Sequence, residues 1–176
     1  MENHIIRWPV TPAVMAAARA QADSMPSEYR YSILDGDGLL PGCVGEQIVK
    51  DYLGILDTPN VNTFDYDILY KGQQLELKTK TVTTIPNPMY EATVPGFNPR
   101  QKCNGYVFVR VLDNLRVGWI LGYISKKEFM EKKRELKQHN VDGSNKFLVK
   151  ASCYNVFIHE LHPPENMLKW PDMVSV

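Results

Sequence analysis

FDYDILYKGQQLELK, the stretch at residues 64–78, organises the rest of this chain. Two runs of alternating polar and apolar residues flank the pair Lys71-Gly72, and glycine supplies the positive φ that a tight turn needs. The stretch therefore predicts a β-hairpin with Lys71 and Gly72 as its two loop residues. The cross-strand pairs of this register are Tyr70 with Gln73, Leu69 with Gln74, Ile68 with Leu75, Asp67 with Glu76, and Asp65 with Lys78.

The two faces of the predicted hairpin differ in polarity. One face carries the apolar side chains of Tyr66, Ile68, Tyr70, Leu75 and Leu77. The other face carries Asp65, Asp67, Gln74, Glu76 and Lys78, together with the apolar Leu69. A slip of one residue would place Glu76 among the apolar side chains, so the pattern itself fixes the register.

The polar face of the hairpin concentrates negative charge. Asp67 and Glu76 face each other with Cβ atoms roughly 4.5–5.5 Å apart, and like charges so placed destabilise a sheet. Lys78 neutralises part of this charge, but Mg²⁺, which binds through one or two carboxylates plus substrate phosphates, does so better. The three side chains predict a site for phosphodiester hydrolysis, in which a metal activates water and Lys78 acts on the nucleophile or the transition state. The alternative is a ladder of solvated charges without chemistry.

Two helices are predicted before the hairpin. Thr11 and Pro12 are a suitable N-cap and first position for a helix at 13–23, part of an N-terminal addition at 12–24. Helical spacing of apolar residues predicts a second helix over 44–54. Glu46 lies in the predicted first turn of that helix, where a carboxylate also complements the helix dipole. Stabilisation of the helix is therefore an alternative to a catalytic role for Glu46.

The segment at 84–100 is rich in proline and has no clear periodicity, so it is predicted to be a loop. Because it follows Lys78, it is expected to contact substrate through Tyr90, Phe97, Arg100 or Lys102. The alternative is a mobile loop that makes no contact. The rest of the chain is predicted to form a second hairpin at 106–112 and 116–124, a helix from the capping box at Ser125 to about 138, and strands at 147–150 and 154–158. The last strands and a turn or short helix form a C-terminal addition at 146–170.

Composition limits the class of protein. The 176 residues are enough for one domain, so residues 1–176 are predicted to form a single unit. A formal net charge of zero argues against tight non-specific DNA binding but is compatible with a locally basic groove. No apolar run approaches the roughly 18 residues of a membrane span, and no signal peptide is evident, so a cytoplasmic protein without membrane contact is expected. The three cysteines fit neither a disulfide framework nor a metal-binding spacing.

A helix bearing Glu46, followed by Asp67 opposite the motif Glu76-Leu77-Lys78, resembles the PD-(D/E)XK nuclease superfamily, which includes restriction endonucleases, phage exonucleases and archaeal Holliday-junction resolvases. The resemblance covers roughly residues 42–112. It implies an α/β (α+β) fold with a restriction-endonuclease-like αβββαβ core at about 42–124, whose mixed central sheet is flanked by helices. The chain departs from the pattern where Tyr66 precedes the aspartate, and where the proline-rich segment replaces the helix expected after the catalytic strand.

The resemblance implies a Mg²⁺-dependent deoxyribonuclease, with Mn²⁺ as a substitute, that cleaves DNA internally or from an end. In this interpretation Asp67 and Glu76 bind Mg²⁺, Glu46 completes or supports the site, and Lys78 positions the attacking water. The protein is expected to work in the cytoplasm (the host cytoplasm if it is phage-encoded), with a homodimer or a subunit role also compatible. Two other hypotheses stay open: an inactive module of this fold that binds nucleic acid or a protein partner, and a structural protein with a solvated charged face.

Overall fold

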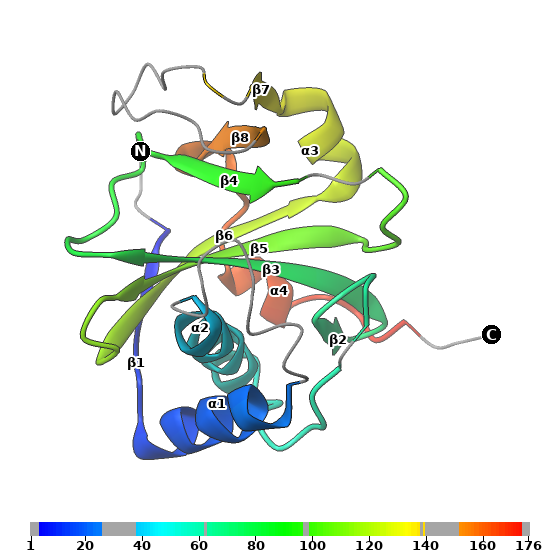
Figure 1. The fold of residues 1–176 in the computed structure, drawn as a ribbon. Helices are drawn as coiled ribbons and strands as arrows, with labels where there is room; N and C mark the ends of the chain where they lie inside the picture. Colours follow the sequence, from blue (N-terminus) through cyan, green and yellow to red (C-terminus); the bar gives the residue numbers. More distant parts are fainter. Residues whose placement is uncertain are drawn as a thin grey trace.

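The computed structural model describes residues 4–25, 38–61, 63–96, 99–137, 139 and 152–173. A five-stranded sheet in the order β1-β6-β5-β3-β2 divides the molecule (Figure 1). Helix α2 packs against one face of this sheet with α1 beside it, and α3 and a three-stranded sheet, β4-β8-β7, cover the other face. The helices are α1 (Pro12–Ser24), α2 (Leu39–Tyr52), α3 (Lys126–Lys132) and α4 (Glu165–Leu168). The strands are β1 (Ile6–Pro9), β2 (Ile68–Tyr70), β3 (Gln73–Val82), β4 (Glu91–Pro95), β5 (Gly105–Leu112), β6 (Val117–Ser125), β7 (Arg134–Leu136) and β8 (Cys153–Phe157).

The central hairpin has the predicted register over its regular part. β2 and β3 pair Tyr70 with Gln73 and Ile68 with Leu75. Both loop residues have positive φ, 48° at Lys71 and 79° at Gly72. Positive φ at both positions is the conformation whose twist matches that of the flanking strands.

The second predicted hairpin is also confirmed, and it places its strands beside β3. β5 and β6 pair antiparallel, and β1 extends the sheet on the far side of β6. β5 runs parallel to β3, with Glu76 beside Tyr106 and Lys78 beside Phe108. A parallel pair needs a crossover connection, because the chain must return to the same end of the sheet.

That crossover corrects the loop prediction for 84–100. The connection contains β4, whose buried Ala92 and Val94 belong to the same apolar cluster as Phe108, and β4 pairs with β8. Alternation of buried and exposed residues over only five positions makes such a strand hard to detect among prolines and asparagines. The described part of the crossover contains a strand of the second sheet where the resemblance implies a helix.

Two apolar cores lie on opposite faces of the main sheet. The core on the α1–α2 side includes Ile68, Leu75 and Leu77. The core on the side of the second sheet includes Phe108, and Tyr66 packs against it. The prediction that Tyr66 shares a face with Ile68 is therefore wrong, because the ladder ends at Ile68 and strict alternation does not extend beyond it.

Three helix predictions meet different outcomes. The first helix is confirmed at Pro12–Ser24, and Thr11 caps it by accepting a hydrogen bond from the Val14 amide. The capping box at Ser125 is confirmed, but α3 ends at Lys132, because Lys133 leaves the helical region (ψ 142°) and β7 follows. The second helix starts at Leu39 instead of residue 44, so Glu46 lies in its interior and the dipole interpretation for Glu46 is wrong.

The C-terminal part adds elements to both faces. β8 covers most of the strand predicted at 154–158, and α4 confirms the short helix expected after Pro163-Pro164. The strand predicted at 147–150 lies outside the described residues. The architecture is a mixed α/β fold with a curled mixed sheet flanked by helices. Within the described residues, none of the helices has the length and apolarity to cross a membrane.

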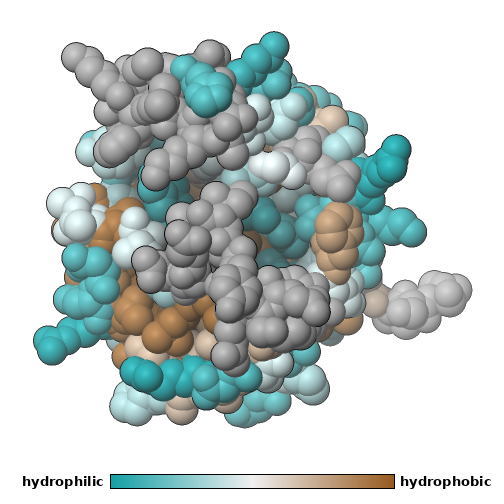
Figure 2. Space-filling view, viewed as in Figure 1, coloured by the Kyte–Doolittle hydropathy of each residue, from teal (hydrophilic) through white to brown (hydrophobic). Residues whose placement is uncertain are grey.

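Figure 2 shows one face of the molecule coloured by hydropathy. On the face drawn in Figure 2, hydrophobic surface is gathered mainly over α2 and the turn between β5 and β6. The three cysteines, Cys43, Cys103 and Cys153, are buried and free, as expected of small apolar residues in a core.

Candidate active site

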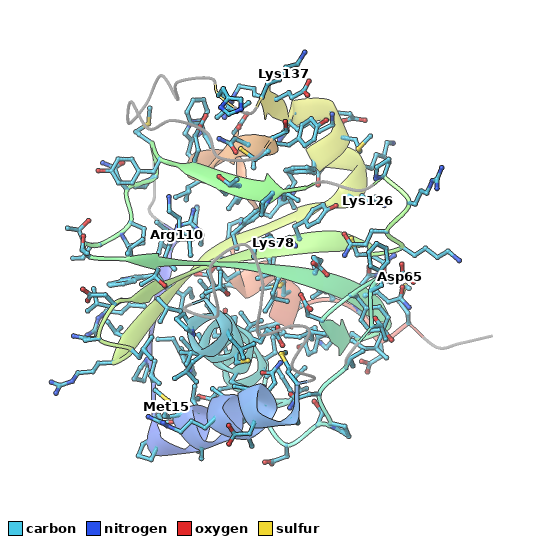
Figure 3. All side chains as sticks on the ribbon, in the orientation of Figure 1. Met15, Asp65, Lys78, Arg110, Lys126 and Lys137 are labelled. Carbon is cyan, nitrogen blue, oxygen red and sulfur yellow. The ribbon has the colours of Figure 1, made fainter. Side chains whose placement is uncertain are left out.

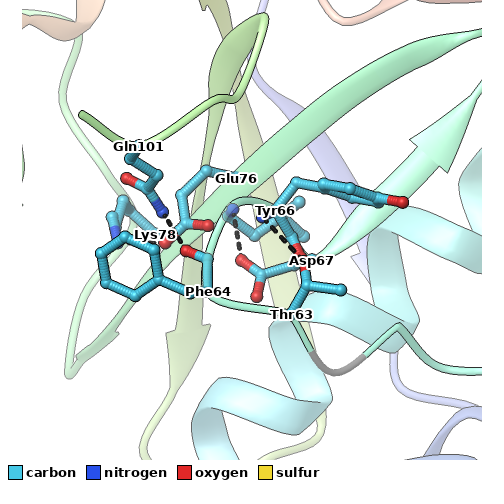
Figure 4. Close-up of polar contacts among 8 residues, drawn as sticks. Thr63, Phe64, Tyr66, Asp67, Glu76, Lys78 and Gln101 are labelled. Carbon is cyan, nitrogen blue, oxygen red and sulfur yellow. Dashed lines mark hydrogen bonds and ion pairs between the residues drawn. The ribbon is translucent and has the colours of Figure 1, made fainter. Parts of the chain in front are cut away.

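The candidate site lies where β2 separates from the edge of β3. Asp67 immediately precedes β2, and its amide donates to the Leu75 carbonyl at 2.9 Å. Its Oδ2 accepts the Leu77 amide at 2.7 Å (Figure 4). The predicted direct pairing of Asp67 with Glu76 is thus replaced by a contact one residue further along β3, where the Asp67 side chain takes the place of a main-chain partner. This bond fixes the carboxylate at the fork of the two strands.

Glu76 and Lys78 project from one face of β3, two residues apart. Lys78 Nζ lies 2.6 Å from Glu76 Oε1, and the Glu76 residue is 9% exposed. The direct partner of Lys78 is therefore Glu76, and the charge of Lys78 also acts on Asp67, as expected from their positions in the register. Figure 3 shows Lys78 near the middle of the molecule, between the helical layer and the second sheet.

Gly45 determines how closely Glu46 approaches β3. A Cβ at Gly45 would lie 2.1 Å from Thr79 Oγ1 and 2.9 Å from Thr79 Cβ, so only glycine allows this contact between α2 and β3. Glu46 is the next residue, and its Oε2 accepts a 2.5 Å hydrogen bond from Gln21 Nε2 on α1. The close contact thus carries the third carboxylate toward the fork.

Replacing Gly45 with alanine is expected to destabilise the protein by about 1–3 kcal/mol, because overpacking against Thr79 outweighs the gain in helix propensity. Thermal unfolding measures the effect, and Gly42→Ala is the matched control in the same helix, since a Cβ there meets nothing within 4 Å. Gly42→Ala should be neutral or stabilise by about 0.5–1 kcal/mol. Adding Thr79→Ala to Gly45→Ala should recover part of the loss, and no recovery would contradict this packing.

The carboxylates perturb one another. Burial, and then the charge of Glu76, raise the pKa of Glu46 to about 7, although the hydrogen bond from Gln21 opposes the shift. Burial and the charges of Glu46 and Glu76 raise the pKa of Asp67 well above its usual range. The positive charge of Lys78 lowers both pKa values only partly. Three carboxylates therefore lie close together in a partly buried site, and the charge of Lys78 does not neutralise them fully. Clusters of perturbed pKa values of this kind are typical of functional sites.

A buried amide network behind Glu46 is absent from the sequence-based prediction. Gln47 Nε2 donates to Gln21 Oε1 at 2.8 Å and to Asn60 Oδ1 at 2.9 Å. Lys50 Nζ donates to the same Asn60 oxygen at 3.1 Å and to the Thr58 carbonyl at 2.6 Å. The network connects α1, α2 and the loop after α2. The available signal was weak: a glutamine among alanines in α1, and Gln47 and Lys50 beside apolar residues of α2.

The residues predicted to bind substrate fall into two places. Lys102 is exposed beside the site, and its amide donates to Asp65 Oδ1 at 2.9 Å. Asp65 therefore anchors this segment instead of facing Lys78, as the register had predicted. Arg100 is exposed in the same segment, where the carbonyls of its neighbours Pro99 and Gln101 accept from Lys126 Nζ. Phe97 lies outside the described residues. Tyr90 lies at the other end of β4, where its carbonyl accepts the Ile158 amide.

The donor atoms of the site suit a hard cation. Glu46, Asp67 and Glu76 offer only carboxylate oxygens, the ligands that Mg²⁺ prefers. Within the described ranges, no three histidine, cysteine, aspartate or glutamate side chains form a group that could hold a metal as they stand. Glu76 contacts Lys78 and Glu46 accepts from Gln21, so a metal bound by these carboxylates would compete with both contacts.

No protein-family model and no curated protein matches the chain. The positions of Asp67, Glu76, Lys78 and Glu46 determine which chemistry the site can support. These residues come from three separate parts of the chain, and their joint placement at one strand fork is the observation on which a function can be based.

Proposed function

We propose that the protein is a metal-dependent nuclease of the PD-(D/E)XK type, acting on DNA. The observation that carries the proposal is the convergence of Glu46, Asp67 and Glu76 with Lys78 at the fork of β2 and β3, where burial and mutual charge raise the pKa of Glu46 and Asp67. Buried like charges destabilise a fold, so a site that holds them fits a task that needs a cation. The α2–β2–β3–β5 arrangement is compatible with a restriction-endonuclease-like core.

The residues present fit Mg²⁺, with Mn²⁺ as a substitute. Asp67 and Glu76 would hold the ion and Glu46 would support it, because all three supply oxygen donors. When bound, such an ion neutralises charge on a phosphate and lowers the pKa of a coordinated water. The bond from the Leu77 amide keeps the Asp67 carboxylate in place, and the bond from Gln21 orients Glu46.

Lys78 would act on the reacting groups directly. An ammonium group in a partly buried site interacts more strongly with a developing negative charge than one in water, because the local dielectric is lower. Release from Glu76 would free its three N–H groups to orient the attacking water or to donate to a phosphate oxygen. The Lys78 ammonium group would be unchanged by the reaction, and its role would be to keep the attacking water aligned with the phosphorus atom and the leaving group.

An inactive module of the same fold, binding nucleic acid or a protein partner, is the second candidate. The observation that favours it is the 2.6 Å pair of Lys78 and Glu76, which leaves each of these charges already satisfied. A module of this kind needs no metal, so affinity for metal separates the two functions.

Titration calorimetry with Mg²⁺ and Mn²⁺ tests the proposal independently of any substrate. Wild type is expected to bind Mn²⁺, and Glu76→Gln is expected to lose most of this affinity. Even a residue that only supports a metal ligand usually contributes about tenfold or more to metal affinity, and a ligand itself contributes at least as much. Glu128→Gln is the matched control: Glu128 caps α3 and accepts from Ser125, away from the fork. Equal metal affinity, or equal absence of it, in wild type and Glu76→Gln would favour the inactive module.

A further inference from the structure

A preformed cavity of about 310 Å³ lies beside Asp67. Its walls are mainly apolar, with three polar groups among them. The apolar walls come from Ile55, Pro59, Val61, Ile68 and Leu69, and the polar groups belong to Lys50, Thr58 and Asp67. Cavities of this size with few polar groups are typical of sites for small organic groups.

The loop wall of the cavity is held in place by hydrogen bonds. Lys50 Nζ donates to the Thr58 carbonyl at 2.6 Å and to Asn60 Oδ1 at 3.1 Å. The Thr58 amide and hydroxyl both donate to the Ile55 carbonyl, at 3.0 and 2.7 Å, and the Ile55 amide donates to the Lys50 carbonyl. A ligand entering the cavity therefore does not have to order this wall first.

The second feature near Asp67 is an exposed aromatic ring, Phe64, three residues before it in the chain. Phe64 is 69% exposed, although the turn that carries it is fixed at both ends. Thr63 Oγ1 donates to the Tyr66 carbonyl and accepts the Tyr66 amide, and the Phe64 carbonyl accepts Gln101 Nε2 at 3.0 Å. Figure 4 shows Phe64 in the turn that also carries Tyr66 and Asp67, with Glu76 and Lys78 on the neighbouring strand. Exposed aromatic rings beside basic groups are the usual platforms for unpaired bases.

We infer that the substrate is a strand with unpaired nucleotides at the cut, whose base next to the reacting phosphate enters the cavity beside Asp67 while a neighbouring base stacks on Phe64. The inference rests on the proposed function, because a cation held by the acidic cluster would have to bind that phosphate. A base within a duplex is paired and stacked, so it must leave the helix before it can enter such a cavity. Single-stranded, gapped or branched DNA presents that base without this cost.

Binding to short single-stranded oligonucleotides tests the inference without cleavage. The probes are fluorescein-labelled oligonucleotides, one normal and one set with a single abasic residue at successive positions. Anisotropy is measured in Ca²⁺, which takes the same oxygen ligands as Mg²⁺ and so neutralises the acidic cluster. Wild type is expected to bind the normal strand on the order of tenfold more tightly than the strand whose abasic residue falls at the cavity. Leu69→Trp fills the cavity from a residue that is 51% exposed, and it should bind both strands equally. Met130→Trp, at a position 44% exposed on α3, is the matched control and should behave as wild type.

Cleavage of matched duplex, gapped and single-stranded DNA completes the test. Wild type should cut the gapped and single-stranded DNA about tenfold or more faster than the duplex, and both Leu69→Trp and Phe64→Ala should reduce that preference. Equal cutting of all three substrates, or no abasic effect on binding by wild type, would overturn the inference and leave the nuclease standing. If wild type cuts nothing, but still binds normal strands better than abasic ones in a way that Leu69→Trp abolishes, the nuclease proposal fails while the base-binding cavity is supported.

Discussion

Lys78→Ala is expected to lower the rate of metal-dependent DNA cleavage by about 10²–10³-fold, the usual effect of removing one positioned donor from a reacting oxygen. The ammonium group of Lys78 lies at the strand fork, 2.6 Å from Glu76. Its loss removes the group that would orient the nucleophile, and it leaves Glu76 without its partner. A single-turnover cleavage assay measures the rate, because it isolates chemistry from product release.

The control for this substitution lies on the same strand. Lys80→Ala removes a lysine two residues further along β3, on the same face but more exposed, and it is expected to leave the rate within about twofold, as is usual for surface positions. Lys78→Arg keeps the charge and changes the geometry, so it should recover only part of the rate. Cleavage by Lys78→Ala at the wild-type rate would contradict the role of this residue.

Glu46→Gln is expected to stabilise the metal-free protein at neutral and alkaline pH. The pKa of Glu46 is raised by burial from 4.5 to about 7, so the folded state favours the protonated acid. Below about pH 4.5 wild type and variant should be equally stable, because the acid is protonated in both states of the wild type. As the pH rises through about 7, wild type loses stability that the variant keeps, and at pH 8 the variant should be more stable by about 1–3 kcal/mol.

Urea unfolding in EDTA at pH 4.5, 6 and 8 measures this difference. The glutamine can still accept the hydrogen bond from Gln21, so the change removes charge with little change in shape. Glu131→Gln, an exposed residue on α3, is the control and should show no trend of this size. A wild type that gains stability relative to Glu46→Gln between pH 4.5 and 8 would contradict the electrostatic account of the site.

Addition of metal should stabilise the folded wild-type protein. A cation that binds only the folded state stabilises it in proportion to ln(1 + [metal]/Kd), about 2.7 kcal/mol at one hundred times Kd. Wild type should therefore gain stability on addition of Mn²⁺ at pH 8, whereas Asp67→Asn should gain little. Asparagine at this position can still accept the Leu77 amide, so a lost response reflects the charge and not the fork.

The hairpin was predictable for local reasons. Alternating polarity around Lys71-Gly72 fixed both the turn and the register, and the same register brought Asp67 close to β3. The contacts of the residues before Ile68 were not predictable, because there the Asp67 side chain, and not a main-chain carbonyl, accepts the hydrogen bond from β3. The face of Tyr66, the partner of Asp65 and the partner of Lys78 all depend on that local departure.

Contacts between distant parts of the chain account for what sequence reasoning missed. Gln21 appeared to be one polar residue of an alanine-rich helix, and its bond to Glu46 exists only because α1 packs on α2. The fit of Gly45 against Thr79 is equally invisible in either segment. The start of α2 at Leu39 moved Glu46 from a helix end to a helix interior, which removed the simplest structural explanation for that carboxylate.

The most direct test of the nuclease is a cleavage assay with the purified protein on supercoiled, linear, single-stranded and branched DNA in Mg²⁺, Mn²⁺ or EDTA, with Asp67→Asn assayed in parallel. We predict cutting of at least one of these substrates that requires the metal and that Asp67→Asn abolishes, together with a faster rate on substrates that carry unpaired nucleotides. An inert wild type, or cutting that persists in EDTA or in Asp67→Asn, would contradict the assignment of the strand fork as a catalytic centre.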